Sequence, residues 1–314
     1  MSKKNTTLIL CALSVILLII GLALIFSDGS DIEESTETAK GAEAPFSLLI
    51  LGKDKVSGLT DVMMLASFDI ENGRICVVQI PRDTYAEFSK EHKKLNTATK
   101  VLGSEKKLCD FLSSSLGVSI DGYVSLELEG FRKAVDAIGG VEIELDRTLY
   151  YNDPSQDLYI YLQKGKQVLD GKKAEMLVRY RSGYVRGDLD RLDMQKRFLA
   201  ALFEKMKASV NISNAYELAS SVFPYMDTDI SLPVFVALGL KALKLESSDI
   251  ELVTLPGEDA RAGNGGASYY VLSAQPTRRI FEEYFVVKSE QIDPKRLFEH
   301  PSNEKFREIY AREN

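Results

Sequence analysis

The chain of 314 residues is acidic, with a formal net charge of -7, and its apolar (45%) and charged (27%) fractions are those of a globular protein. The acidic balance argues against a nucleic acid as partner. Only two histidines, His92 and His300, are present, which excludes a metal site of Cys/His type. Outside the N-terminal region, Cys76 and Cys109 fall in apolar patterns, which predicts buried thiols rather than a disulfide.

An uncharged apolar stretch at residues 6–26 is the first predicted element. Its length matches the roughly 20 residues that cross a bilayer as a helix. Lys3 and Lys4 precede it and acidic residues follow, so residues 1–5 are expected in the cytoplasm and the main domain outside the membrane. A cleaved signal peptide is the alternative, but its apolar region would be shorter and would end in an A-x-A-like site. We favour a single-pass anchor in the cell membrane.

Residues 27–44 are acidic and rich in small residues, which is typical of a flexible linker. One extracytoplasmic domain is expected over residues 45–288. The highly charged residues 289–314 are expected to form a C-terminal extension rather than a second domain.

Three predicted strands, at residues 46–51, 62–68 and 74–80, open this domain. Their ends carry Asp54, Asp61 and the pair Arg82-Asp83. Charged residues beside a buried sheet are typical of ligand sites in α/β folds. Two carboxylates without His or Cys suit Mg²⁺, which binds through one or two carboxylates plus substrate phosphates. The alternative is that these aspartates serve turns and caps.

The middle of the chain alternates between helical and extended patterns. Helices are predicted at 102–116, 130–138 and 172–179, and strands at 122–128 and 141–145. Gly139-Gly140 is interpreted as a helix C-terminal turn rather than a phosphate loop, because no helix begins after it. Residues 148–162 are interpreted as a surface excursion and residues 165–171 as a turn.

Residues 179–195 place four arginines and three aspartates in one short stretch: Arg179, Arg181, Arg186, Arg191, Asp188, Asp190 and Asp193. Clustered guanidinium groups repel one another unless carboxylates or a bound anion neutralise them. Arginine binds phosphate oxygens two at a time, so a phosphorylated ligand is the favoured anion. A solvated, salt-bridged helix start is the alternative. A helix is predicted at 188–206, with Asp188, Arg191 and Gln195 on one face.

Later elements are predicted as helices at 214–223, 232–245 and 273–285, with a strand at 250–255.

Ordered motifs over residues 46–206, about half of the chain, carry a resemblance to a known family. They read LILGKD, T-D-x-M-M-L, IPRDT, KLN, VDAIGGVEIEL, LxxGxQxLDG, RxR and DxxRxxxQ. In their order and spacing the chain resembles the LytR-CpsA-Psr family of cell-wall glycopolymer ligases. The resemblance implies an α/β fold, a three-layer α/β/α sandwich with a mixed central sheet, preceded by one transmembrane helix in a bacterium of Gram-positive type.

The same resemblance implies a Mg²⁺-dependent phosphotransferase. Such an enzyme moves a glycopolymer (teichoic acid, capsule polysaccharide or similar) from a polyprenyl pyrophosphate carrier to peptidoglycan, forming a phosphodiester. Asp54 and Asp61 match the family's metal-binding acids. Its pyrophosphate contacts are matched by Arg82, Arg179, Arg181, Arg191 and Gln195. Arg82, Asp188 and Arg191 are the expected catalytic residues, with Asp188 either orienting an arginine or accepting the proton of the attacking hydroxyl.

Two positions depart from the family pattern. Leu59 and Met194 stand where the family usually has arginines. Two other functions therefore remain open: a non-catalytic module that binds polyprenyl phosphates and regulates or scaffolds envelope assembly, and a lipid pyrophosphatase that uses water as acceptor.

Overall fold

The structure is a computed structural model. It describes residues 45–53, 58–69, 71–89, 93–154, 158–180, 194, 197–198, 201–202, 204–206, 208–209, 220–235, 238, 245, 249–261 and 267–287, without the side chains of Asp61 and Arg261. The predicted anchor, linker and C-terminal extension lie outside these residues. Within them, no helix is long and apolar enough to cross a bilayer.

The chain divides into two compact units. The first combines Ala42–Ser125 with Ser247–Asn314, and the second spans Leu126–Glu246. The second unit therefore interrupts the sequence of the first.

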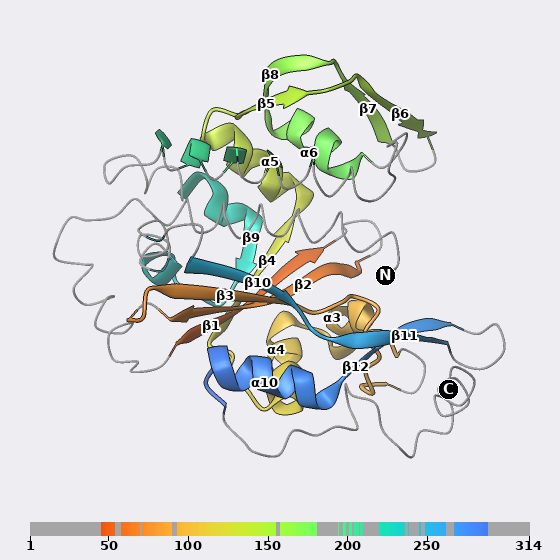
Figure 1. Cartoon of the computed structure of the whole chain (residues 1–314), viewed down its shortest axis with the longest axis vertical. Helices are drawn as coiled ribbons and strands as arrows, with labels where there is room; N and C mark the ends of the chain where they lie inside the picture. Colours follow the sequence, from red (N-terminus) through yellow and green to blue (C-terminus); the bar gives the residue numbers. More distant parts are fainter. Residues whose placement is uncertain are drawn as a thin grey trace. The chain divides into compact units, whose positions relative to one another are not determined.

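A mixed sheet forms the centre of the first unit, as predicted. Its strands lie in the order β10-β3-β2-β1-β4 (Figure 1). The β1–β2 and β2–β3 pairs are antiparallel, whereas β10 lies parallel to β3. The strands are β1 (Phe46–Lys53), β2 (Thr60–Asp69), β3 (Arg74–Gln79), β4 (Gly122–Glu127) and β10 (Ile250–Thr254). They confirm the five strands predicted from the apolar runs.

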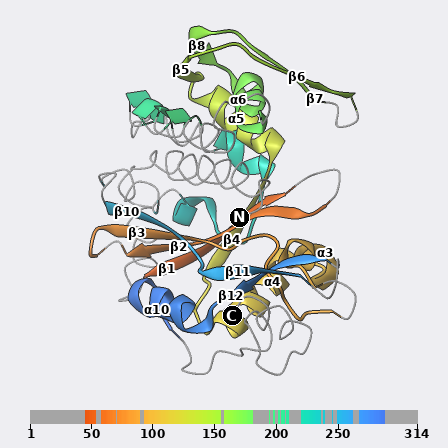
Figure 2. The same ribbon diagram turned by 45° about the vertical axis from the view of Figure 1, so that its right-hand side comes forward.

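Helices α3 (Ala98–Leu102), α4 (Glu105–Leu116) and α10 (Ala274–Tyr284) lie on one side of this sheet (Figures 1 and 2). Alternate strand residues such as Leu49, Leu65 and Val78 share a buried cluster with Leu112 of α4 and Phe281 of α10. The residues between them, among them Leu48, Met64 and Val77, are equally buried. Both faces of the sheet are therefore covered, which explains why its strands are continuous apolar runs rather than alternating patterns.

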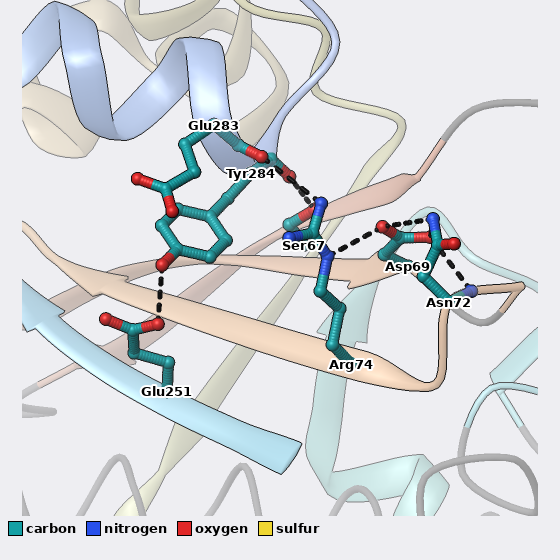
Figure 3. Close-up of polar contacts among 7 residues, drawn as sticks. All are labelled: Ser67, Asp69, Asn72, Arg74, Glu251, Glu283 and Tyr284. Atoms are coloured by element: carbon teal, nitrogen blue, oxygen red, sulfur yellow. Dashed lines mark hydrogen bonds and ion pairs between the residues drawn. The ribbon is translucent and has the colours of Figure 1, made fainter.

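Polar contacts fix the end of α10 against the sheet (Figure 3). The Ser67 hydroxyl donates to the Tyr284 carbonyl, and Arg74 Nη2 donates to the Glu283 carbonyl at 3.3 Å. The Tyr284 hydroxyl donates to Glu251 at 2.5 Å, and this bond raises the pKa of Tyr284. The hydroxyl thus keeps its proton, and the contact ties α10 to β10 across the physiological pH range.

A hairpin that the sequence did not predict, β11 (Gly257–Arg261) with β12 (Ser268–Leu272), packs on the chain that follows β3. The Tyr270 amide donates to the Asp83 carbonyl at 2.9 Å, and the Tyr85 amide donates to the Tyr270 carbonyl at 2.8 Å. The rings of Tyr85 and Tyr269 meet edge to face. The hairpin therefore holds the backbone on both sides of Thr84.

The second unit begins with α5 (Leu128–Ala137) and continues through four strands to α6 (Gly171–Arg179). The strands form two antiparallel ribbons, β5 (Val141–Leu145) with β8 (Gly165–Leu169) and β6 (Leu149–Asp153) with β7 (Leu158–Leu162), which lie over α5 and α6 in both views (Figures 1 and 2). The turn predicted at 165–171 is wrong, because most of it is strand β8. Only Leu169 of this strand is fully buried, so the sequence of β8 is too polar to indicate a strand. Its extended structure comes from pairing with β5.

The surface excursion expected at 148–162 is exposed but not irregular, since it forms the β6–β7 hairpin. The predicted helix turn at Gly139-Gly140 is confirmed. Both glycines have φ near +80°, and their amides donate to carbonyls in the last turn of α5. The unit also holds η3 (Phe223–Tyr225) and β9 (Met226–Thr228).

The LDG segment shows why α6 begins where it does. Asp170 caps the helix by accepting from the Lys173 amide at 2.8 Å. The Gly171 amide donates to Asp136 of α5 at 2.7 Å, and a Cβ on Gly171 would lie 2.1 Å from the Arg132 carbonyl oxygen. Glycine is therefore required for the two helices to approach this closely.

Parts of the remaining predicted helices are described. In the 188–206 helix, Met194, Phe198, Leu202 and Met206 are helical and buried, each four residues from the next. This spacing puts the four side chains on one face of the helix and confirms its helical periodicity over 194–206. Residues 220–222 and 232–235 are also helical, and Cys76 and Cys109 are buried without a disulfide. Burial raises the pKa of Cys76 to about 12, so its thiol stays protonated and inert.

Candidate functional site

Three strand ends of the first unit meet at one edge of the sheet. The β2–β3 register runs to Met64 opposite Gln79, and the Ile80 amide extends it by donating to the Met63 carbonyl at 2.9 Å. Asp61 lies in β2, three residues before Met64, and Arg82 follows Gln79 by three residues in the turn after β3, so both lie toward the same end of the sheet. On the other side of β2, Lys53 pairs with Thr60. The backbones of Asp61 and Arg82 thus lie at the same end of the sheet, and the roles of the two side chains stay predictions.

Gly52 allows β1 to pack closely against β2 at this end of the sheet. The register between β1 and β2 shifts at Gly52 and Lys53, and a Cβ on Gly52 would lie 3.0 Å from Cβ of Val62. Beside the shift, Lys53 forms an ion pair with Glu105 at the start of α4. The hydroxyls of Thr60 and Thr99 are 2.8 Å apart, and both residues are buried. The segment preceding Asp54 and Asp61 is therefore tied to the helices beneath it.

Arg82 lies in the turn that follows β3. The Thr84 hydroxyl and amide both donate to the Pro81 carbonyl, at 2.6 and 3.0 Å, and this closes the turn. The side chain of Arg82 is 16% exposed, and its Nε lies 3.7 Å from Oδ2 of Asp83. A guanidinium has a fork of N–H donors that matches phosphate oxygens, so the residue type at this position suits an anionic ligand.

The KLN segment completes the surroundings of Arg82. Lys94 Nζ donates to Oδ1 of Asp83 at 2.9 Å, and the same ammonium lies 5.7 Å from the centre of the Tyr269 ring. The Asn96 amide donates to the Arg82 carbonyl at 2.9 Å. Oδ1 of Asn96 is buried and has no hydrogen-bond partner among the described residues. An unsatisfied buried acceptor is costly and typical of functional sites.

Arg179 belongs to the second unit, where it is the last residue of α6. Its Nη1 donates to Glu175 at 2.9 Å, one helical turn earlier. Glu175 also forms an ion pair with Arg132 of α5, whose Nη1 lies 3.4 Å from Oε2 of Glu175. Glu175 thus neutralises part of the charge of two guanidiniums, and the Arg179 side chain is 29% exposed.

The other predicted site residues, Asp54, Arg181, Asp188, Arg191 and Gln195, lie outside the described residues, as does the side chain of Asp61. Their roles stay predictions. No cluster of three or more metal-binding side chains occurs in the described part of the chain. The sequence placed Asp83 among the charged residues at the strand ends but assigned no role to it or to Lys94, although they lie within the motifs IPRDT and KLN.

The two departures from the family pattern differ in their surroundings. Met194 is only 7% exposed and continues the apolar stripe of its helix. Leu59 is partly exposed and directly precedes β2. The cation missing at 194 is therefore replaced by core packing, whereas the position at 59 keeps access to solvent.

Comparisons with known proteins agree with this fold. The LytR_cpsA_psr family matches residues 26–285. The polyisoprenyl-teichoic acid–peptidoglycan teichoic acid transferase TagV of Bacillus subtilis is 25% identical over 271 residues, which are 82% of this chain and 69% of TagV. The transferase of the same description named TagU, from Bacillus mycoides, is 28% identical over 244 residues, 76% of this chain and 78% of TagU.

Solved structures show the same likeness. The crystal structure of Bacillus subtilis TagV matches with a TM-score of 0.60 at 25% identity, covering 77% of this chain and 98% of that one. Protein gbs0355 of Streptococcus agalactiae matches with a TM-score of 0.66 at 22% identity, covering 89% and 99%, and supports the fold alone. Because the family model matches most of its length, and because it carries the ordered motifs, the chain belongs to the LytR-CpsA-Psr family.

Proposed function

We propose that this protein is a phosphotransferase that moves a glycopolymer from a polyprenyl pyrophosphate carrier to peptidoglycan through a phosphodiester bond. The names of TagV and TagU describe transfer of teichoic acid from a polyisoprenyl carrier to peptidoglycan, and both cover most of this chain. The polymer transferred here belongs to the same class, a teichoic acid, a capsule polysaccharide or a related glycopolymer.

The observation that carries the proposal is the position of Arg82 in the turn after β3, at the end of the sheet where β2 begins with Thr60 and Asp61. Cleaving a pyrophosphate requires neutralising charge on the oxygens that gain it. The guanidinium of Arg82 supplies this charge from a mostly buried position. Asp83 is a positioning residue, because it contacts Arg82 and is itself bound by Lys94.

Mg²⁺ is the proposed cofactor, held by Asp54 and Asp61. Support comes from the sequence positions of the two acids, because Asp54 follows Lys53 and Asp61 follows Thr60, and Lys53 and Thr60 are paired across β1 and β2. Their donors are hard carboxylate oxygens, which suit Mg²⁺ together with substrate phosphates. When bound, the ion would stabilise negative charge on the phosphoryl oxygens.

Residues 179–195 are proposed to complete the pyrophosphate site. Arg179, Arg181 and Arg191 would bind phosphate oxygens, Gln195 would add a neutral donor, and Asp188 would orient an arginine or take the proton from the attacking hydroxyl. We further propose that residues 6–26 anchor the chain in the cell membrane, with the main domain outside it, since the polyprenyl carrier is a membrane lipid. The covered sheet faces support a three-layer arrangement.

The test uses the purified full chain, a polyprenyl-pyrophosphate saccharide and peptidoglycan fragments as acceptor, with and without Mg²⁺, and measures release of polyprenyl phosphate. We expect Mg²⁺-dependent release that Arg82→Ala abolishes. Arg278→Ala, on the exposed side of α10 where Arg278 pairs with Glu282, is the matched control. Equal release by the Arg82 variant and the unsubstituted chain would refute the assignment.

The burial of Met194 favours a second candidate, a non-catalytic module that binds polyprenyl phosphates, because the chain lacks a cation there. Tight lipid binding without any Mg²⁺-dependent release would support this module and eliminate the transferase. A lipid pyrophosphatase would release polyprenyl phosphate equally well with and without peptidoglycan fragments. Analysis of the saccharide product therefore separates hydrolysis from transfer.

A further inference from the structure

The β6–β7 hairpin exposes a face made of Tyr150, Asn152, Tyr159 and Tyr161, named here the tyrosine face. The three tyrosines are 58%, 55% and 47% exposed, respectively. Solvent-exposed aromatic surface of this extent commonly marks an interaction site. None of the residues assigned to the pyrophosphate site belongs to this face.

The register of the hairpin gathers these side chains. Tyr150 lies directly opposite Tyr161, and Asn152 directly opposite Tyr159. The rings of Tyr150 and Tyr159 meet edge to face, with centroids 6.1 Å apart. Tyr159 and Tyr161 are two residues apart on β7, which separates them by about 7 Å along the strand. The rings thus form one continuous aromatic surface.

The opposite face of the hairpin gives this surface a fixed support. Leu149, Ile160 and Leu162 alternate with the exposed tyrosines and are buried. A one-residue slip between the strands would expose these apolar side chains, so burial fixes the register. Binding would therefore order few additional groups, which lowers its entropic cost.

The chemistry of the tyrosine face fits a sugar. Aromatic rings pack against the C–H faces of pyranose rings, while tyrosine hydroxyls and the Asn152 amide can exchange hydrogen bonds with sugar hydroxyl and acetamido groups. None of the four side chains is charged. A polyanionic polymer or an anionic lipid surface would call for Lys or Arg at such a site.

We infer that the tyrosine face binds the uncharged sugar backbone of a polysaccharide, namely the glycan strand of peptidoglycan. The inference rests on the proposed function, which makes peptidoglycan the acceptor, and adds a site that holds the acceptor strand away from the reacting groups. Ordinary cross-strand packing alone would stabilise the hairpin without binding anything. The two explanations differ in a binding measurement.

The experiment titrates chitohexaose, an uncharged β-1,4-linked oligomer of N-acetylglucosamine, into the purified full chain by calorimetry. The test variant combines Tyr150→Ala with Tyr161→Ala. We expect its dissociation constant to rise at least about tenfold, because two stacking surfaces are removed. Tyr225→Ala removes a tyrosine of the same unit that is 38% exposed and should change nothing. Combined Tyr150→Phe and Tyr161→Phe keeps the rings and should retain most of the affinity.

Three results would overturn the inference: no binding of chitohexaose to the unsubstituted chain, equal binding by the alanine variant, or loss of binding in the Tyr225 control. Vesicles of anionic phospholipid provide a further arm. If the alanine variant lost vesicle binding but kept chitohexaose binding, the face would be a membrane contact instead. Chitohexaose binding is measured without the lipid carrier, whereas the proposed function is tested by the effect of Arg82→Ala on release of polyprenyl phosphate, so failure of this inference is distinguishable from failure of the proposed function.

Discussion

Arg82 and Arg179 carry the same charge but are held in different ways. Arg82 follows a central strand, and its turn is fixed by hydrogen bonds to KLN and to the β11–β12 hairpin. Arg179 ends a helix, where Glu175 is shared with Arg132. The side chain of Arg82 is also the less exposed of the two, at 16% against 29%.

This difference predicts unequal contributions to catalysis. A guanidinium fixed before the substrate arrives needs little rearrangement during the reaction, and electrostatic stabilisation depends on such preorganisation. An arginine at a helix end must exchange part of its contact with Glu175 for the substrate. We therefore expect Arg82 to act as the rigid contact and Arg179 as the adjustable one.

The largest effect should come from removing the rigid contact. We expect Arg82→Ala to lower turnover by roughly 10²–10³, and Arg179→Ala to lower it by about tenfold, the effect of a partly solvated contact. Initial rates of polyprenyl phosphate release at saturating substrate measure both. If both variants lost turnover to the same extent, the two arginines would not differ as rigid and adjustable contacts.

The support of Arg179 can be broken through the start of its helix. Gly171→Ala forces a Cβ onto the Arg132 carbonyl and should destabilise the fold by about 3 kcal/mol, the upper range for overpacking. Thermal unfolding followed by circular dichroism checks this loss. Lys172→Ala changes the exposed neighbour in the same turn and should leave the melting temperature within a degree or two. An unchanged melting temperature in the Gly171 variant would mean that α5 and α6 are not packed as described.

Introducing arginine at each of the two departing positions compares a buried position, Met194, with a partly exposed one, Leu59. Met194→Arg should cost about 2 kcal/mol of stability, because a charged group replaces a buried side chain. Leu59→Arg introduces a cation at a partly exposed position beside β2 and should preserve the fold while raising turnover. Thermal melts and release assays on both single variants test this pair. A stable and more active Met194 variant would contradict it.

A smaller effect is expected from the residue that positions Arg82. Asp83→Asn keeps the shape of the side chain but removes the charge that contacts Arg82 and Lys94, and should lower turnover by about fivefold to tenfold, the loss of one partly exposed charge contact. The KM should change little, since Asp83 acts through Arg82. Glu87→Gln, which removes a charge paired with Lys93, is the matched control and should retain full activity.

The smallest effect should follow Glu175→Gln. Pairs of this kind contribute about 0.3–0.5 kcal/mol each in a helix, so stability should fall by less than about 1 kcal/mol. Denaturant titration measures the change. A loss as large as that expected for Gly171→Ala would show that Glu175 is a main support of α6 and not an exchangeable contact.

The sequence predicted the central sheet well, since its strands are uninterrupted apolar runs whose ends carry Asp61 and Arg82. It failed where pairing rather than composition decides the structure. Gly165–Leu169 is too polar to indicate a strand, and Ser268–Leu272 becomes one only by pairing with Gly257–Arg261. The Asp83–Lys94 contact joins residues 11 positions apart across an irregular segment, so no periodicity in the sequence could indicate it.

The parallel pairing of β10 with β3 has a consequence for the order of folding. Thr254 donates to Gln79 across a separation of 175 residues, and the second unit occupies much of the chain between them. Contacts between residues so far apart in the sequence form slowly, whereas a contiguous segment can fold as soon as it has been synthesised. The second unit is therefore expected to fold during translation before the sheet edge at Arg82 is complete. A nascent chain truncated before residue 250 should accordingly resist proteolysis in its second unit while remaining inactive.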